Sequence, residues 1–225
     1  STSRRQRQMC IRDSLRLEER ADWSFYDSPR ITFDNMRFGS PPEQATLEAN
    51  PFARFTADIF GQQVWMLSET LGADIEEVRM EHELATAPES RDLRAGRLEA
   101  GTVSGQRFCW SGLRGGESLI EIEVLWTVGG FYPESWPKPR DGWTISIEGD
   151  PSFRTHFMTL ASLGRRDVSI DDHVQAAGST TTAMQPVNSI PAICEAEPGW
   201  RTSVELGLVG AGIGFRHPSV WRPLD

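Results

Sequence analysis

Two polar side chains, Thr182 and Asn188, interrupt an otherwise apolar pattern near the C-terminal end of the chain. Around them, Val187 and Ile190 recur at the spacing of a helix. A buried amide without hydrogen-bond partners costs about 1–3 kcal/mol, so packing alone would seldom retain Asn188 in such a segment. Asn188 therefore either satisfies a backbone turn at Pro191 or faces a ligand.

Histidines with acidic neighbours are candidates for metal binding or acid–base catalysis, but their spacing here fits neither. His82 lies between Glu81 and Glu83, and strand alternation turns it away from both, onto the apolar face of its strand. We expect His82 to be a hydrogen-bonded core or pocket residue. His173 follows two aspartates in a polar stretch that is typical of a solvated loop. The sequence predicts no metal site, and no catalytic residue is assigned.

A glycine-rich stretch at residues 210–214 resembles the beginning of a dinucleotide-binding loop. The third glycine of that fingerprint falls at position 215, which is Phe215. Only ten residues follow, too few for the helix whose N-terminus would hold the pyrophosphate. We therefore expect this chain to have no nucleotide-binding βαβ unit of its own.

Composition excludes several classes of partner. The net charge of −9 argues against a nucleic-acid-binding surface, which needs clustered positive charge. The three cysteines are far apart and odd in number, which indicates reduced thiols. Residues 174–194 carry no charge, but their Thr, Gln, Asn, Ser and Pro residues make them unsuitable for a membrane span. We expect a cytoplasmic protein with neither a nucleic-acid nor a membrane partner.

One long helix is the clearest structural element. Asn50 before Pro51 is a good N-cap and first-turn pair, and Gly72 is a good C-terminal stop. Between them lies a broad apolar stripe, which favours a core or subunit interface. The stripe consists of Phe52, Phe55, Ile59, Phe60, Trp65, Leu67 and Leu71.

Alternating apolar and polar residues predict a run of strands. The expected strands are residues 15–23, 78–84, 106–111, 117–128, 143–147 and 153–157. Gly115-Gly116 predicts a hairpin between the third and fourth of these. In the fourth, Ile120 and Ile122 face one side of the sheet, whereas Glu121 and Glu123 face the other.

The remaining segments complete an α+β arrangement. Residues 33–39 are expected to be a short irregular or helical piece, and residues 161–178 a loop or short helix. A helix follows and ends near Pro198-Gly199, although Pro186 leaves its start open. Residues 204–208 are expected to be a final strand or extended piece. The predicted fold is a mixed, mostly antiparallel sheet layered with helices.

Three blocks of the sequence resemble one enzyme family. They are residues 21–29 with 33–39, residues 143–149 with Pro151 and Ser152, and residues 182–184, 187–188, 190–191 and 194–199. The first resembles the segment that follows the nucleotide domain, the second a central hairpin and the third a C-terminal signature. The family comprises dihydrodipicolinate reductase-like NAD(P)-dependent oxidoreductases, with 2,4-diaminopentanoate dehydrogenase and the native amine dehydrogenases among them.

The resemblance implies a C-terminal substrate-binding and dimerisation domain. Members carry a Rossmann domain upstream, so the chain is expected to be N-terminally truncated and inactive alone, with no cofactor bound. The implied parent enzyme uses NAD(P) to reduce imines or oxidise amines, acts on a small-molecule amine, imine or carbonyl compound, and is a homodimer. The catalytic glutamate proposed for amine dehydrogenases lies in the absent half. A non-catalytic dimerising or small-ligand-binding α+β module is the alternative.

Residues 1–14 are set apart from the expected domain, which spans residues 15–225. Arginines crowd this stretch, and residues 5–14 resemble translated adapter sequence. We expect a segment that is either not native to the protein or a disordered basic tail, with a nucleic-acid-binding arm as a third reading.

The resemblance also motivates a hypothesis for the pocket. Trp23 and Tyr26 lie on the loop leaving the nucleotide domain and are expected to wall the cleft between domains. With His156, which faces either a pocket or solvent, and Thr182, they are the candidate substrate-binding residues. Asn188 is the candidate contact to the nicotinamide. Helix capping and turn satisfaction are the structural alternatives for Thr182 and Asn188.

Overall fold

The computed structural model describes residues 11–138 and 140–207. The chain divides into two compact units, residues 1–159 and residues 160–225. Each unit is described by itself below. Among the described residues, no helix combines the length and the apolar character that crossing a membrane requires.

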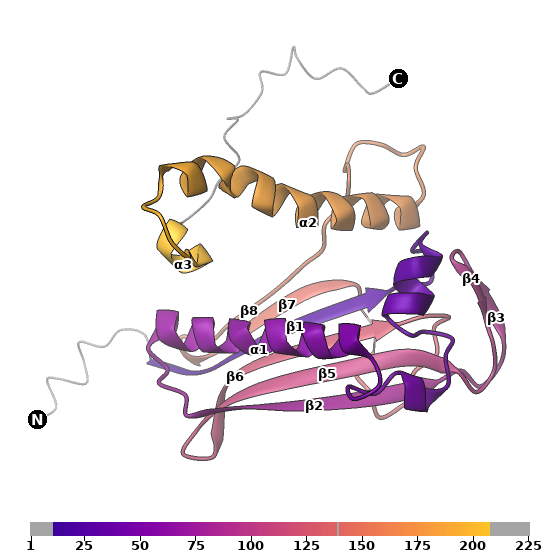
Figure 1. Cartoon of the computed structure of the whole chain (residues 1–225), viewed down its shortest axis with the longest axis horizontal. Coiled ribbons are helices and arrows are strands. Elements are labelled where there is room, and N and C mark those ends of the chain that lie inside the picture. Colours follow the sequence, from indigo (N-terminus) through magenta and orange to yellow (C-terminus); the bar gives the residue numbers. More distant parts are fainter. Residues whose placement is uncertain (1–10, 139, 208–225) are drawn as a thin grey trace, which may run out of the picture. The chain divides into compact units, whose positions relative to one another are not determined.

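Unit 1 is built around a six-stranded mixed sheet (Figure 1). From one edge to the other the strands are β2 (Glu77–Thr86), β5 (Val103–Arg114), β6 (Glu117–Thr127), β1 (Ile11–Asp22), β7 (Gly142–Asp150) and β8 (Phe153–Phe157). Neighbouring strands are antiparallel except β1 and β6, which pair in parallel. The predicted α+β class and mostly antiparallel sheet are confirmed. β1 begins at Ile11, before its expected start at residue 15.

The register assigns every side chain of β1 to one of two faces. Leu15 pairs with Ile120 of β6, and Leu17 pairs with Ile145 of β7. Since side chains alternate along a strand, these residues share one face. We call it the apolar face, and the opposite face, which carries Glu123, the charged face.

The helix α1 (Pro51–Leu71) covers the β2-β5-β6 part of the apolar face. The side chain of Asn50 accepts a hydrogen bond from the backbone N–H of Phe52, and Gly72 ends the helix in the left-handed conformation with φ of 66°. Both predicted ends are therefore confirmed. The ring of Phe60 stacks on Trp110, whose Nε1 donates to the carbonyl of Ala57 at 3.0 Å.

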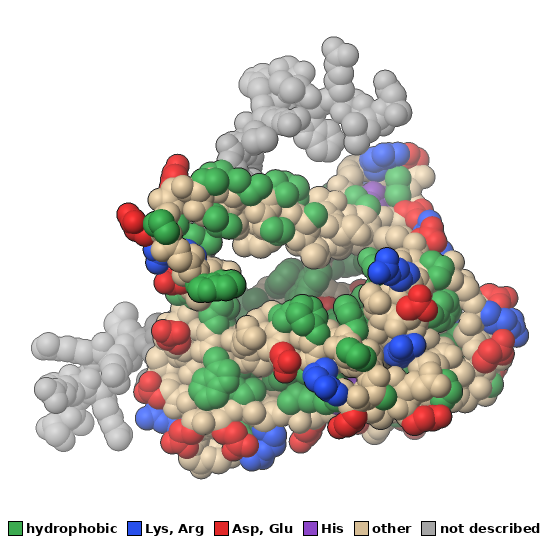
Figure 2. Space-filling model, in the orientation of Figure 1, with side chains coloured by type: hydrophobic (Ala, Val, Ile, Leu, Met, Phe, Trp, Pro, Cys, Tyr) green, Lys and Arg blue, Asp and Glu red, His purple; other side chains and the backbone are tan. Residues whose placement is uncertain are grey.

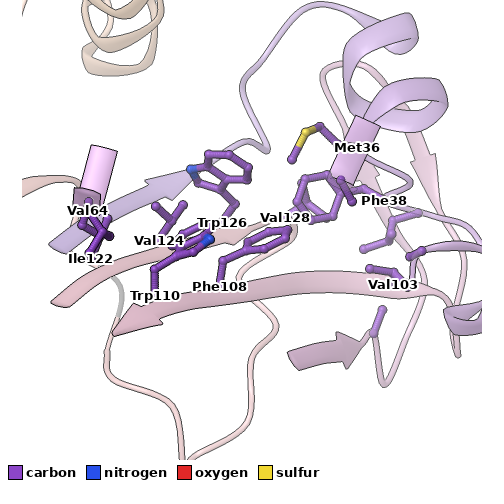
Figure 3. Packing of buried hydrophobic residues seen from close by; sticks show 14 of the residues in the cluster. Met36, Phe38, Val64, Val103, Phe108, Trp110, Ile122, Val124, Trp126 and Val128 are labelled. Atoms are coloured by element: carbon purple, nitrogen blue, oxygen red, sulfur yellow. The ribbon is translucent and has the colours of Figure 1, made fainter. Parts of the chain in front are cut away.

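The core of unit 1 fills the space under α1 and beside it. Figure 3 shows Phe108 and Trp110 of β5 next to Val124 and Trp126 of β6. These side chains are buried, and the rings of Phe108 and Trp110 stack with centroids 5.7 Å apart. Burial of such aromatic groups is the main contribution that holds α1 on the sheet.

Short elements connect the long ones. The expected short piece around residues 33–39 is a π-helical turn, η2 (Arg30–Asn35), and it is followed by a 3-10 turn, η3 (Pro42–Gln44). A two-stranded hairpin of β3 (Arg91–Leu93) and β4 (Gly96–Leu98) was not expected. Its strands are too short to show an alternating pattern in the sequence.

Unit 2 contains α2 (Ile170–Glu195) and α3 (Ser203–Leu206). The side chain of Ser169 caps α2, so the helix begins inside residues 161–178, the stretch expected to be a loop or short helix. It continues through Pro186 and Pro191. Each proline removes one backbone donor from the helix, but the hydrogen bonds on either side remain.

The final strand or extended piece expected at residues 204–208 is wrong for residues 204–206, which are helical. Residues 203–206 form α3, and a capping box explains why: the side chain of Thr202 accepts from the backbone N–H of Glu205, and the side chain of Glu205 accepts from that of Thr202. The glycine-rich residues 210–214 lie outside the described residues.

Candidate functional site

The candidate site of unit 1 lies where β1 ends. Trp23 extends the β1–β6 ladder, because its backbone N–H donates to the carbonyl of Thr127 at 2.8 Å. Its ring packs against the ring of Trp126, with centroids 5.6 Å apart, and against Tyr26, at 5.0 Å. The structure therefore brings Trp23 and Tyr26 together at one end of the apolar face.

The loop that carries these two rings is fixed by hydrogen bonds. The hydroxyl of Ser24 donates to Asp22 and accepts from the backbone N–H of Gly129, at 2.7 Å from that nitrogen. The backbone N–H of Asp22 donates to Asp141 at 3.0 Å. Three segments that are distant in sequence thus hold the loop in place, which orients Trp23 before any ligand binds.

Sequence reasoning missed Glu19, which lies beside this loop. Glu19 follows Leu15 and Leu17 on the apolar face of β1 and is half-buried. Trp126 Nε1 donates to one of its carboxylate oxygens at 2.8 Å, and Trp143 Nε1 donates to the other at 3.2 Å. A signal was present in the sequence, because an acidic residue at an apolar-facing position of a strand breaks the alternation.

The charged face carries a cluster of ion pairs around Glu123. Its carboxylate, which is fully buried, binds Arg20, Arg16 at 3.1 Å and Arg107 at 2.8 Å. Burial alone would raise the pKa of Glu123, but the hydrogen bonds and charges of Arg107 and Arg20 outweigh it, so the pKa is lowered. Sequence reasoning placed Glu123 on the correct face but did not anticipate that its carboxylate is buried among arginines.

Cys109, Glu121 and Glu123 bring possible metal-ligand atoms within 4.8 Å of one another. Burial, followed by the charges of Glu121 and Glu123, raises the pKa of Cys109 to about 11. The thiol is therefore protonated at neutral pH, and the carboxylate of Glu123 is already occupied by guanidinium groups. The ion pairs account for this arrangement better than metal binding does.

His156 lies on the charged face, on the edge strand β8. Its Nδ1 is 2.9 Å from the hydroxyl oxygen of Thr144, the residue it pairs with on β7. The sheet therefore separates His156 from Trp23 and Tyr26, which contact the apolar face. These three candidate residues do not form one group within unit 1.

Thr182 and Asn188 belong to α2 of unit 2. The hydroxyl of Thr182 donates to the carbonyl of Gly178 at 2.9 Å, and this side chain is exposed, whereas Asn188 is half-buried. Six residues of α-helix turn the chain through about 600°, which places the two side chains roughly 120° apart around the helix. Neither residue caps a helix end.

The other two histidines among the described residues, His82 and His173, have structural partners. Nε2 of His82 is 3.3 Å from the side-chain oxygen of Gln106, and its ring stacks on Phe108 at 4.3 Å, so the expectation of a hydrogen-bonded core residue is confirmed. For His173, the expected solvated loop is wrong. His173 is buried in the first turns of α2, and its Nε2 lies 3.2 Å from the carbonyl of Arg165.

Comparison with known proteins gives the chain a family. The sequence profile of the 2,4-diaminopentanoate dehydrogenase C-terminal domain matches residues 59–218. The chain belongs to this family. No curated protein sequence matches it. The expected resemblance to the C-terminal domain of 2,4-diaminopentanoate dehydrogenase is thereby confirmed.

A solved structure supports the same fold. The amine dehydrogenase from Mycobacterium smegmatis is 19% identical in sequence, with a TM-score of 0.56 over 89% of this chain. At this identity, the likeness shows the fold of the domain alone. The match covers 53% of the amine dehydrogenase, so this member of the domain family spans about half the length of that enzyme.

Proposed function

We propose that the chain is the substrate-binding and dimerisation half of an NAD(P)-dependent oxidoreductase. The proposed enzyme transfers a hydride between a nicotinamide and the carbon of a C=N or C=O group, in imine reduction or amine oxidation. The match of residues 59–218 to the dehydrogenase domain family is the observation that carries the proposal. The substrate class is a small-molecule amine, imine or carbonyl compound.

The described residues do not fit the dinucleotide itself. A dinucleotide-binding unit needs a strand, a glycine-rich turn and a helix whose N-terminus meets the pyrophosphate. Here β1 is followed by the loop 23–29, which contains no glycine, and then by η2. In the proposed enzyme, the pyrophosphate of the cofactor is therefore held outside the described residues, and this chain shapes the substrate side of the cleft.

Support for the five proposed pocket residues is unequal. Trp23 and Tyr26 have the strongest support as substrate contacts, because their rings touch in a loop that is already fixed. Thr182 as a substrate contact, and Asn188 as a contact to the nicotinamide, rest on the family resemblance. His156 has the least support, since it lies on the other face of the sheet from the two aromatic residues.

A fusion protein tests the proposal. The chain would be joined to the part of the Mycobacterium smegmatis amine dehydrogenase that the match does not cover. We expect the fusion to form reduced nicotinamide when it is given NAD⁺ or NADP⁺ and a primary amine, as measured by absorbance. The unmatched part of that enzyme, expressed alone, is the control. A folded, cofactor-binding fusion that turns over no amine, imine or carbonyl compound would disprove the proposal.

A cofactor titration of the chain alone distinguishes the proposed enzyme half from a module that binds its ligand without a second domain. Because the described residues hold no dinucleotide cradle, titration of the 225-residue chain with reduced nicotinamide cofactor should show no change in cofactor fluorescence. Tight binding in that titration would contradict the proposed division of labour.

We further propose that the protein is a cytoplasmic homodimer. Large hydrophobic side chains lie exposed on α1 and are visible among charged residues of both signs in Figure 2. Phe55 and Trp65 are 60% and 46% exposed, which is typical of residues at subunit interfaces. Sedimentation equilibrium measures the association directly, and a monomer at all concentrations would contradict the homodimer.

A further inference from the structure

Glu19 is held in an unusual way for a carboxylate at the centre of a sheet. Both of its oxygen atoms accept hydrogen bonds from neutral indole N–H groups, those of Trp126 and Trp143. Among the described residues, no Arg, Lys or His side chain pairs with it. Each carboxylate oxygen can accept two hydrogen bonds, so this arrangement leaves acceptor capacity on both oxygens.

The neighbouring carboxylates are treated differently. Glu18 precedes Glu19 in β1, and its side chain lies on the charged face. It pairs with Arg20 at 2.8 Å and lies 3.6 Å from Arg154. Glu123 binds several arginines on the same face. The sheet thus neutralises its other central carboxylates with guanidinium groups and supplies Glu19 with neutral donors alone.

Aromatic rings frame Glu19 on both sides of β1. On the β6 side, the ring of Trp126 packs against Trp23, with centroids 5.6 Å apart. On the β7 side, the ring of Trp143 stacks on Phe157, also at 5.6 Å. The ring of Phe157 is 44% exposed, and Glu19 and Trp143 are half-buried, so the arrangement is not sealed inside the core of unit 1.

A carboxylate among aromatic rings is complementary to an organic ammonium ion. The free lone pairs of the carboxylate accept the N–H groups of the cation in charge-assisted hydrogen bonds. Trp126 and Trp143 turn their N–H edges toward the carboxylate, so the electron-rich faces that can attract the same charge belong to the rings packed against them, Trp23 and Phe157. Two indole donors fix the orientation of the carboxylate beforehand, which reduces the entropy lost on binding.

We propose that Glu19, with Trp126, Trp143 and the rings of Trp23 and Phe157, binds the protonated amino group of a primary amine. The inference rests on the proposed function, because it names the group by which an amine substrate or product is recognised. It requires neither the cofactor nor catalysis, and binding to the chain alone therefore tests it.

The test follows the indole N–H signals of the 225-residue chain by proton–nitrogen NMR during titration with n-butylammonium chloride. The signals of Trp126 and Trp143 are assigned through the variants Trp126→Phe and Trp143→Phe. We expect both signals to shift in a saturable way, with a dissociation constant on the order of 1 mM for an isolated small cation. n-Butanol and sodium chloride at the same concentrations should cause no saturable shift.

The charge of Glu19 is tested by substitution. Glu19→Gln should weaken binding about tenfold or more, because the amide has no negative charge and its NH2 group cannot accept the second indole hydrogen bond. Glu148→Gln, on the charged face of β7, is the matched control and should bind like the wild type. If Glu19→Gln does not fold, the wild-type titration decides alone. Unmoved signals of Trp126 and Trp143 with n-butylammonium, or equal shifts with n-butanol, would overturn the inference.

The two proposals fail in different ways. A saturable shift of the two indole signals together with an inactive fusion protein would leave the ammonium site standing and remove the oxidoreductase. Hydride transfer by the fusion without that shift would leave the oxidoreductase standing and remove Glu19 as the site that binds the amine.

Discussion

Glu121 and Glu123 lie two residues apart on β6, and their side chains face the same side of the sheet. The side chain of Glu121 is 25% exposed and pairs with Arg16, whereas that of Glu123 is fully buried among Arg16, Arg20 and Arg107. Burial changes the consequence of losing the charge, since water can replace a lost partner at Glu121 but not at Glu123.

Replacing Glu123 by Gln should therefore be costly. The substitution removes the buried negative charge that Arg16, Arg20 and Arg107 share, and leaves the buried guanidinium group of Arg20 with Glu18 alone. We expect the free energy of unfolding to fall by about 3–5 kcal/mol. Glu121→Gln, on the same strand and face, should cost about 0–1 kcal/mol. Urea denaturation followed by tryptophan fluorescence measures both. Equal effects of the two substitutions would show that the cluster acts as a surface network.

His82 makes the free energy of unfolding of unit 1 depend on pH, and this effect is separate from that of the carboxylates. Burial lowers the pKa of His82, and the opposing effects of Gln106 and Glu48 do not cancel it. The unfolded chain therefore takes up the proton first as the pH falls. The stability that neutral His82 contributes is fully present above its unfolded pKa of about 6.5 and is lost as the pH falls through the lower folded value.

Removal of the titrating group should flatten this part of the pH profile. Between about pH 7.5 and pH 5.5, the wild type should lose more stability than His82→Leu, because only the wild type must protonate a buried imidazole. Urea denaturation at a series of pH values measures the difference between the two chains. Parallel pH profiles would show that the proton on His82 is not linked to folding.

At the scale of elements, the contact between α1 and the sheet depends on a glycine in β5. A Cβ atom on Gly112 would lie 2.8 Å from Cγ1 of Val64 and 3.0 Å from Cδ1 of Ile75, both side chains of the core. Such contacts are shorter than side chains tolerate, so α1 approaches the sheet as closely as it does because this position has no side chain.

Two glycine substitutions test this packing from opposite sides. Gly112→Ala should destabilise the fold by about 1–3 kcal/mol, because it overfills the contact. Gly61→Ala, within α1, meets its nearest atom, Cδ1 of Trp110, at 4.0 Å, and should stabilise by about 0.5–1 kcal/mol through the helix preference of alanine. Thermal unfolding measured by circular dichroism reports both. A neutral Gly112→Ala would mean that α1 can move away from the sheet at little cost.

At the scale of the whole molecule, the chain consists of two units with different kinds of support. Unit 1 has a continuous core between its sheet and α1. In unit 2, α2 leaves large apolar side chains such as Ile190 and Ile193 more than half exposed. Residues 158–169 join β8 to α2 and contain Arg165 and Arg166, both exposed.

Limited digestion with trypsin should separate the two units. Among the described residues, cleavage is expected earliest after Arg165 or Arg166, because exposed polar connections outside regular structure are the preferred sites of proteolysis. The fragment that contains β1 to β8 should keep the near-ultraviolet circular dichroism of its buried tryptophans. Early cleavage within β5 or β6, or loss of that signal after cleavage at Arg165, would show that unit 1 depends on unit 2.

The sequence was most informative where structure depends on neighbouring residues. Asn50, Pro51 and Gly72 set the ends of α1 because a cap, a first-turn proline and a left-handed glycine act over one turn of helix. Strand alternation located six strands for the same reason. Three sequence blocks indicated the family, which the match of residues 59–218 to the family profile confirms. The capping box at Thr202 was equally local and was overlooked.

Tertiary structure decided the features that depend on residues far apart in the chain. Four features join segments that no local pattern connects. They are the parallel pairing of β1 with β6, the burial of Glu123 among arginines, the indole partners of Glu19 and the position of His156 on the charged face. Side-chain periodicity assigns a residue to a face of its strand. Only the folded sheet determines what covers that face, and thus whether a carboxylate there meets water, an arginine or an indole.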